Sequence, residues 1–264
     1  HNFDRPVIDG GFTFIVDGVF TSMGKYLETQ GFDCTNPDTG GGWPAPPSLD
    51  KIKSWMQLGF KNYAAYGGDP FNFATGNLVT LEDLFTTTGP GGYSHQTALV
   101  HNSQDDRLSR VGAGWSATFN ARAQRFSDGS VLIVRGDGSS YHFLPDGAGG
   151  FAVDANQGAR LVDAGGGRLE LRVDDASTWV FDASHPEGVG DLVEIRDGNG
   201  QVTTFTYAPL SGDPLFRSLT GITLPGNQSI TVASNAEGLV TGLTAPDGRS
   251  WTLTYDGGRH RGGL

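Results

Sequence analysis

Residues 239–259 read LVTGLTAPDGRSWTLTYDGGR, and their pattern is the strongest indicator of the fold class. Apolar and polar residues alternate toward its end, so Trp251, Leu253 and Tyr255 share one face of a strand. The Pro-Asp-Gly sequence at 246–248 is typical of a tight turn, and the apolar run before it has the length of a strand. The stretch therefore predicts a β-hairpin with one buried face.

The same pattern recurs four times further upstream. The paired strands are expected at 132–134 with 141–143, 169–171 with 178–181, 192–195 with 203–207, and 219–224 with 229–232. The leucines that open the last four copies are 23, 27 and 20 residues apart. A lone hairpin is marginally stable in water, but hairpins laid side by side build a continuous sheet. For the turn at 197–200, Asp-Gly-Asn-Gly, we predict type I′ geometry rather than a calcium loop.

Three zones differ in pattern. Residues 1–66 hold the one expected helix, at about 48–61, with Ser48 as its N-cap and apolar residues spaced three or four apart. Residues 67–128 predict strands at 77–84, 94–100 and 115–122. Residues 129–264 hold the repeated hairpins. We therefore expect an all-β protein with a short N-terminal segment that contains one helix.

Composition restricts the possible partners. Glycine contributes 41 and proline 13 of the 264 residues, and 37 % of residues are apolar, which is typical of a folded, turn-rich chain. A formal charge of −11 repels phosphate backbones, so we expect no nucleic-acid partner. The single cysteine, Cys34, allows neither an internal disulfide nor a cysteine-rich zinc site. No apolar run reaches 18 residues, so we expect no membrane insertion.

The hairpin motif resembles the tyrosine-aspartate (YD) repeat of Rhs and teneurin-type proteins. The residues that match the repeat are Tyr207, Asp247, Gly248, Trp251, Tyr255, Asp256, Gly258 and Arg259. A second set is similar to the domain that opens the shell in bacterial Rhs proteins: Asp69, Pro70, Thr75, Gly76, Asn102, Ser103, Gly112, Gly114 and Trp115. The sequence departs from that domain's pattern by His101 in place of Tyr and Ala113 in place of Pro.

The resemblance implies a fold and a role. It implies tandem hairpins in a spiral that closes into a hollow shell, often around a toxin encoded at the carboxyl end. We therefore expect a structural shell segment of a bacterial secreted or cell-surface protein, without catalytic residues, cofactor or metal. Its partners would be the rest of the same shell and the enclosed effector. Residues 1–66 would act as a cap or plug, and the array would continue beyond Leu264.

Two other classes of function stay open. A cell-surface adhesion or glycan-binding module could use the outer sheet face or residues 1–66 to hold a glycan or protein partner, with exposed aromatics or the Arg-Gly-Asp sequence at 135–137 as candidate contacts. Residues 227–229 also fit a glycosylation sequon, in an expected turn. A carbohydrate-active enzyme would need two carboxylates across a cleft, for which Glu82 and Asp105 are the candidates. We expect the aromatics to be core residues and the acidic residues to fix turns. His95, His101 and His142 are interpreted as ordinary strand histidines rather than metal ligands.

Overall fold

The structure is a computed structural model of the chain. It describes residues 13–17, 43–59, 71–72, 75–152, 158–173, 177–210 and 213–256, and every structural statement below concerns these residues. They form three β-sheets and a single α-helix, which confirms the expected all-β class.

Thirteen strands make one large sheet. They are β1 (Thr13–Asp17), β7 (Arg122–Arg125), β8 (Val131–Val134), β9 (Ser140–Phe143), β10 (Ala159–Gly165), β11 (Arg168–Val173), β12 (Thr178–Asp182), β13 (Val189–Arg196), β14 (Val202–Leu210), β15 (Asp213–Leu224), β16 (Gln228–Ser234), β17 (Val240–Thr244) and β18 (Ser250–Asp256). Strands β10 to β18 follow one another side by side and antiparallel. All five predicted hairpins are confirmed, because each predicted pair of strands is paired in the sheet.

Two additions complete the large sheet. Strand β7 pairs with both β13 and β8, and β9 continues on the far side of β8. At the other end β1 lies parallel to β18, with Ile15 opposite Thr254. The N-terminal strand therefore covers the outer edge of the last hairpin.

The smaller sheets come from the middle of the chain. Strands β2 (Val79–Thr88), β3 (Ser94–Asn102) and β6 (Trp115–Ala117) form one sheet, with the short 3₁₀ helix η1 (Pro90–Gly92) in the β2–β3 turn, and β4 (Leu108–Ser109) with β5 (Gly112–Ala113) forms another. The single strand predicted at 115–122 is wrong. The Asn120 N–H donates to the Ala117 carbonyl at 2.8 Å, and this turn carries the chain from β6 into β7 of the large sheet.

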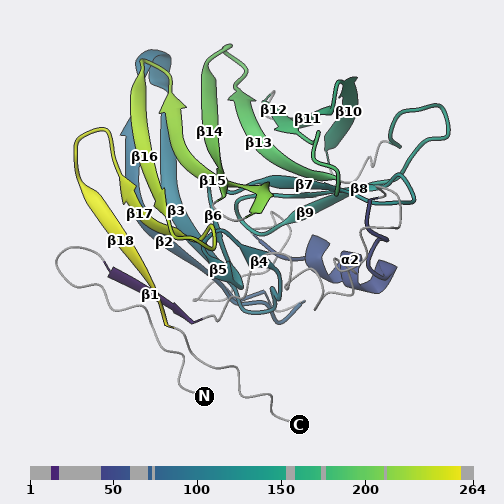
Figure 1. The fold of residues 1–264 in the computed structure, drawn as a ribbon, viewed down its shortest axis with the longest axis horizontal. Helices are drawn as coiled ribbons and strands as arrows, with labels where there is room; N and C mark the ends of the chain where they lie inside the picture. Colours follow the sequence, from purple (N-terminus) through teal and green to yellow (C-terminus); the bar gives the residue numbers. More distant parts are fainter. Residues whose placement is uncertain are drawn as a thin grey trace, which may run out of the picture.

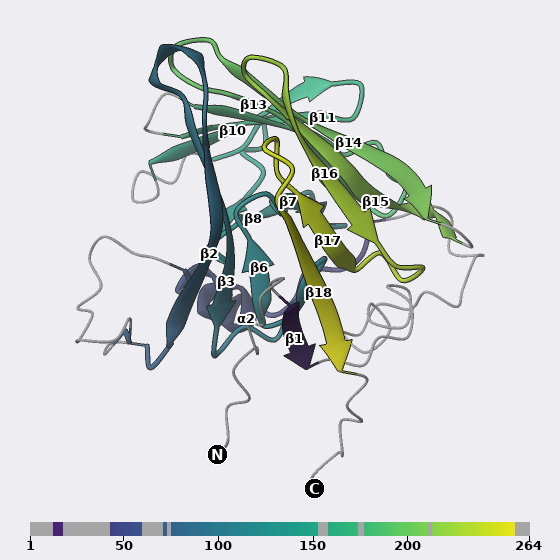
Figure 2. The same cartoon turned by 90° about the vertical axis from the view of Figure 1, so that its left-hand side faces the viewer.

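The large sheet curves, and the β2–β3 hairpin runs along its inner side (Figures 1 and 2). Phe85 of β2 stacks on Trp251 of β18 with ring centroids 4.6 Å apart. On β11 the alternate residues Leu169 and Leu171 point into the same core and are fully buried. Each such side chain contributes about 2 kcal/mol by leaving water. The hairpin from the opening segment and the repeated hairpins thus share one core.

The helix α2 (Leu49–Met56) covers the opposite face of β8. Ile52 and Trp55 pack there against Leu132, so β8 is buried on both faces. The predicted start is confirmed, because the Ser48 hydroxyl accepts the Lys51 N–H at 3.3 Å. The predicted end is wrong: the helix ends at Met56 and is capped by Gln57, and Gly59 has φ +76°, outside the helical region. Residues 60–61 lie outside the described part of the chain.

Five turns share one geometry, at 126–130, 135–139, 197–201, 235–239 and 245–249. In each, the first N–H donates to the fifth carbonyl and the fourth N–H to the first carbonyl, at 2.8–3.1 Å. The fourth residue is always glycine, with φ between +78° and +86°. The type I′ prediction at 197–200 is therefore wrong, because Gly200 has positive φ while Gly198 and Asn199 do not. A type I turn followed by a left-handed glycine fits these hydrogen bonds.

Candidate functional site

The motif residue Asn102 lies in a polar junction, which we define as Asn77, Asn102, Asp105, Arg107 and the 135–139 turn. Asn102 is buried; its Oδ1 accepts from Asn77 Nδ2 and from the Gly59 N–H, both at 2.9 Å. Its Nδ2 donates to the Asp137 carbonyl at 3.0 Å. One amide side chain therefore ties the segment after α2, the start of β2 and the β8–β9 turn together.

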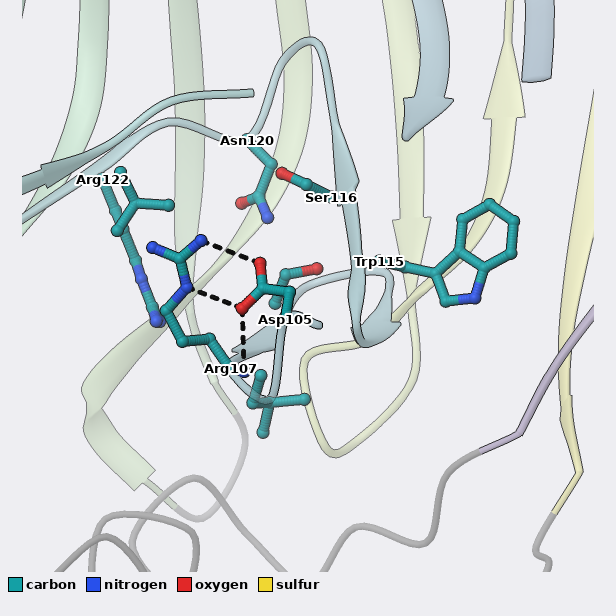
Figure 3. Close-up of a pocket in the computed structure, with 9 residues that line it drawn as sticks. Asp105, Arg107, Trp115, Ser116, Asn120 and Arg122 are labelled. Carbon is teal, nitrogen blue, oxygen red and sulfur yellow. Dashed lines mark hydrogen bonds and ion pairs between the residues drawn. The ribbon is translucent and has the colours of Figure 1, made fainter. Parts of the chain in front are cut away.

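An ion pair lies beside this amide. Arg107 donates through Nε and Nη2 to the two carboxylate oxygens of Asp105, at 2.7 and 2.8 Å, and each side chain is only 5 % exposed. Figure 3 shows the guanidinium lying along the carboxylate. Arg107 also donates through Nη1 to the Ser140 hydroxyl at 2.6 Å and through Nη2 to the Gly138 carbonyl. The pair thus holds the β8–β9 turn against the loop that precedes β4.

A small pocket opens next to the pair. Trp115, Ser116, Asn120 and Arg122 contribute to its wall (Figure 3). Its volume is about 10 Å³, which is enough for roughly one water molecule. A sugar ring does not fit there, so this pocket is a part of the joint rather than a substrate site.

The helix is fastened to the same junction. Trp55 Nε1 donates to Asp106 Oδ1 at 2.9 Å, and Lys51 pairs with the other oxygen of that carboxylate. Burial opposes ionisation of Asp106, but the hydrogen bonds from Lys51 and Trp55 outweigh it and hold the pKa of the carboxyl below its usual value. The Arg107 guanidinium lies 5.4 Å from the Trp55 ring centroid, a cation–π contact.

The remaining residues of the opening motif fix neighbouring backbone. The Thr75 hydroxyl accepts the Asn77 N–H at 3.2 Å, and the Ser103 hydroxyl accepts the Leu78 N–H at 2.9 Å. Gly76, Gly112 and Gly114 have φ of +74°, +109° and +71°. The Trp115 ring lies 4.9 Å from that of His101. Asp69, Pro70, Gly258 and Arg259 lie outside the described residues.

In the repeats, the motif tyrosines close their own hairpins. Tyr207 donates its hydroxyl proton to the Leu192 carbonyl at 2.7 Å, and Tyr255 donates to the Val240 carbonyl at 2.5 Å. Both acceptors lie 15 residues upstream, in the first strand of the same hairpin. Burial raises the pKa of both tyrosines above the usual value. Both phenols therefore stay protonated and act as donors at neutral pH.

The other repeat residues stabilise the turn and the core. Asp247 Oδ1 accepts the Arg249 N–H at 3.1 Å, and Gly248 takes the left-handed position of the turn, with φ +86°. Trp251 is buried against Phe85, and Asp256 ends β18. These positions therefore define the repeat by holding it together.

A charge cluster of Arg110, Asp182, Asp191 and Arg217 was not expected from the sequence. Arg110 Nη2 donates to Asp191 Oδ1 at 2.6 Å, and Arg217 Nε donates to Asp191 Oδ2 at 2.9 Å. Arg217 also reaches Asp182 at 3.0 Å. The cluster joins the β4–β5 turn to β12, β13 and β15. The sequence indicates it only through Asp191 and Arg217, which are charged residues within otherwise largely apolar strands.

The candidate catalytic carboxylates Asp105 and Glu82 lie in different parts of the described structure. Asp105 is held by Arg107, while Glu82 lies on β2 opposite Leu99 of β3. Within the described residues no three His, Cys, Asp or Glu side chains form a group that could hold a metal ion. His95 is partly buried, and this burial lowers its pKa to about 4.

The residues considered for adhesion make contacts within the protein. In the Arg-Gly-Asp sequence, Gly136 is buried, and the Asp137 carboxylate accepts from the Ser139 N–H and hydroxyl at 3.0 and 2.6 Å. The aromatic row packs on the core: Phe205 and Trp251 are buried, and Tyr141, Trp179, Tyr207 and Tyr255 are partly buried against it. The expectation that these aromatics are core residues is confirmed. At the sequon, Asn227 has φ +58° in the turn between β15 and β16.

The described residues thus form a mostly antiparallel β protein in which an opening hairpin is joined to a row of further hairpins. Residues 68–143 match a family described as a domain of unknown function, DUF6531. This stretch includes the opening motif and the polar junction. No curated protein matches the chain.

Among solved structures, the chain is similar to the N-terminal domain of the effector protein SpvB from Salmonella typhimurium strain LT2. It has 13 % sequence identity and a TM-score of 0.34, over 57 % of this chain and 72 % of that one. A likeness of this size does not identify a shared function. None of the helices among the described residues is long and apolar enough to cross a membrane.

Proposed function

We propose that this chain is the opening wall segment of an Rhs/YD-repeat shell that encloses or presents a carboxyl-terminal effector in a bacterial secreted or surface protein. The observation that carries the proposal is the unbroken row of antiparallel hairpins from β10 to β18, with the opening hairpin β2–β3 packed along its inner side. The described motif residues support it, because Asn102 joins neighbouring segments and Tyr207 and Tyr255 each close a hairpin.

A scaffold needs rigid joints rather than a reactive cleft. Arg107 and Asp105 satisfy each other, and Tyr207 and Tyr255 donate to backbone carbonyls. These interactions fix backbone positions and leave these groups engaged within the protein. The proposal accordingly assigns no catalytic residue and no cofactor. The buried aromatics support this function over a glycan-binding surface, which would need exposed rings.

The test is made on the natural gene product. We expect the open reading frame to continue past the Leu264 codon with further Tyr-Asp hairpins and a carboxyl-terminal effector. In limited proteolysis of that product, the effector should resist cleavage while intact hairpins surround or hold it, and should become sensitive once 2–4 M urea loosens the wall. A product without further hairpins, or an effector cleaved at the rate of the isolated effector, contradicts the proposal.

A further inference from the structure

The outermost strand β10 (Ala159–Gly165) leaves one edge open. It pairs with β11 on one side, and no described strand pairs with its other side. At the opposite end of the row, β18 has β1 along its edge. Open edges present unpaired N–H and C=O groups and accept extended peptides.

A row of arginines crosses the outer face of the sheet and begins at this edge. Arg160 of β10 stands opposite Arg172 of β11. Thr178 of β12 stands between Arg172 on one side and Arg196 of β13 on the other. The three arginines are exposed. Like charges directly opposite each other in neighbouring strands are destabilising unless they are neutralised.

Two of the three are neutralised from their own strands. Arg172 pairs with Glu170 at 3.4 Å, and Arg196 pairs with Glu194, so β11 and β13 both carry the sequence Glu-x-Arg. The corresponding position on β10 is Val162, which stands opposite Glu170. Among the described residues Arg160 has no carboxylate within ion-pair distance. The edge strand therefore lacks the counter-charge that its neighbours have.

We propose that β10 is a docking edge for an extended polypeptide segment that places a carboxylate opposite Arg160. The segment would add one more strand to the sheet through main-chain hydrogen bonds, and its acidic residue would complete the charge pattern of the outer face. The β10 strand of a second copy does not supply this carboxylate. Residues opposite each other in a sheet point to the same side, so Arg160 would face Arg160, Val162 or Ala164 of another β10, and none of these is acidic.

The inference does not depend on the proposed shell, because the edge and its charge belong to the chain itself. The probe is a fluorescein-labelled nine-residue peptide of alternating threonine and valine with a central glutamate, and the matched probe has lysine in its place. With the 264-residue protein at about 50 mM salt, fluorescence anisotropy should show at least a tenfold tighter Kd for the glutamate peptide. Amide hydrogen exchange should slow at residues 159–165 and stay unchanged in β18.

Two charge reversals locate the contact. Arg160→Glu should reverse the preference toward the lysine peptide. Arg196→Glu lies in the same row but three strands from the edge, roughly 14 Å away, and should leave the preference as it is. Both substitutions are on the surface, so folding is checked by an unchanged circular dichroism spectrum. Equal binding of the two peptides, protection outside β10, or protection of β10 that follows protein self-association would each overturn the proposal.

Discussion

At the scale of single residues, the motif tyrosines are the clearest case of a side chain that closes its own repeat. Tyr207→Phe and Tyr255→Phe each remove the donor to a strand carbonyl and leave the ring in place. Each substitution should lower the free energy of unfolding by about 1 kcal/mol. The measurement is the shift of the midpoint in a urea titration. The two effects should be alike because each hydroxyl donates to a strand carbonyl 15 residues upstream in its own hairpin. If neither variant shifts the midpoint, the hydroxyls do not hold the hairpins.

Gly200 and Gly248, at the fourth position of the repeated turn, are needed for their backbone conformation rather than for space. Gly200 and Gly248 have φ of +78° and +86°, and a Cβ at either position meets no atom within 4 Å. Alanine there should cost about 1 kcal/mol of stability, and Asn at 200 should cost less, because Asn tolerates positive φ. At Gly136 a Cβ would lie 2.6 Å from the Ala117 carbonyl oxygen, so Gly136→Ala should cost more than about 2 kcal/mol in the same urea titration. An equal loss at all three positions would contradict this distinction.

Burial of histidines, of His95 above all, makes stability depend on pH. Burial lowers the pKa of His95 to about 4 in the folded chain, against about 6.5 in an unfolded chain. Between these values the unfolded chain binds a proton that the folded chain excludes, so stability falls as pH falls through this window. Burial also lowers the pKa of His101 and His142, which adds to the effect.

For His95 alone the loss at pH 5 should be about 2 kcal/mol relative to pH 7. The measurement is the melting temperature at both pH values, for the wild type and for His95→Gln. The variant should lose less stability than the wild type on acidification. Identical losses in the two proteins would mean that His95 is not the group that titrates.

At the scale of elements, the charge cluster fastens the β4–β5 turn to the large sheet. Asp191→Ala leaves Arg110 and Arg217 facing each other without the carboxylate between them, and Arg110 is only 12 % exposed. This substitution should cost about 3–5 kcal/mol. Glu194→Ala on the same strand breaks an ion pair with a half-exposed arginine and should cost less than about 1 kcal/mol. Similar urea midpoints for the two variants would show that the cluster does not fasten the turn.

Which elements could be predicted depends on how local their causes are. The repeated hairpins follow from alternating apolar residues and a glycine turn, both of which lie within about 20 residues. Strand β10 carries the same alternation but was not predicted, because no turn-and-strand pattern like that of the other copies marks it. The type I′ prediction at 197–200 was wrong because it rested on the glycines and the asparagine alone. The turn includes a fifth residue, Gln201, whose carbonyl accepts the Asp197 N–H and closes it.

The candidate site was predictable only in its list of residues. Asn102 was identified from a motif, yet its role comes from contacts with Gly59 and Asp137 in other segments. Arg110 meets Asp191 across 81 residues and the Arg217 carbonyl across 107, and no local pattern encodes such pairs. Parallel pairing of β1 with β18 has the same origin, since it joins residues from opposite ends of the described chain.

At the scale of the whole molecule, the two ends of the hairpin row differ. Thr13–Asp17 pairs along β18, whereas the described residues leave the far side of β10 open. This difference makes β1 the element whose loss should change how the protein associates. An uncovered edge of seven residues that alternates apolar and polar side chains is a template for pairing with another chain.

Ile15→Pro tests the cap directly, because proline removes an N–H from the middle of β1 and is poorly tolerated inside a sheet. The variant should release β1 from β18 and shift the protein toward dimers and larger species, measured by size-exclusion chromatography with light scattering between about 5 and 100 μM. Amide exchange should speed up in β18 at low concentration and slow again as the protein associates. Ile15→Thr, which keeps the N–H and a β-branched side chain, is the control and should behave as the wild type. A proline variant that keeps the wild-type mass distribution and the wild-type protection of β18 would show that β1 does not guard this edge.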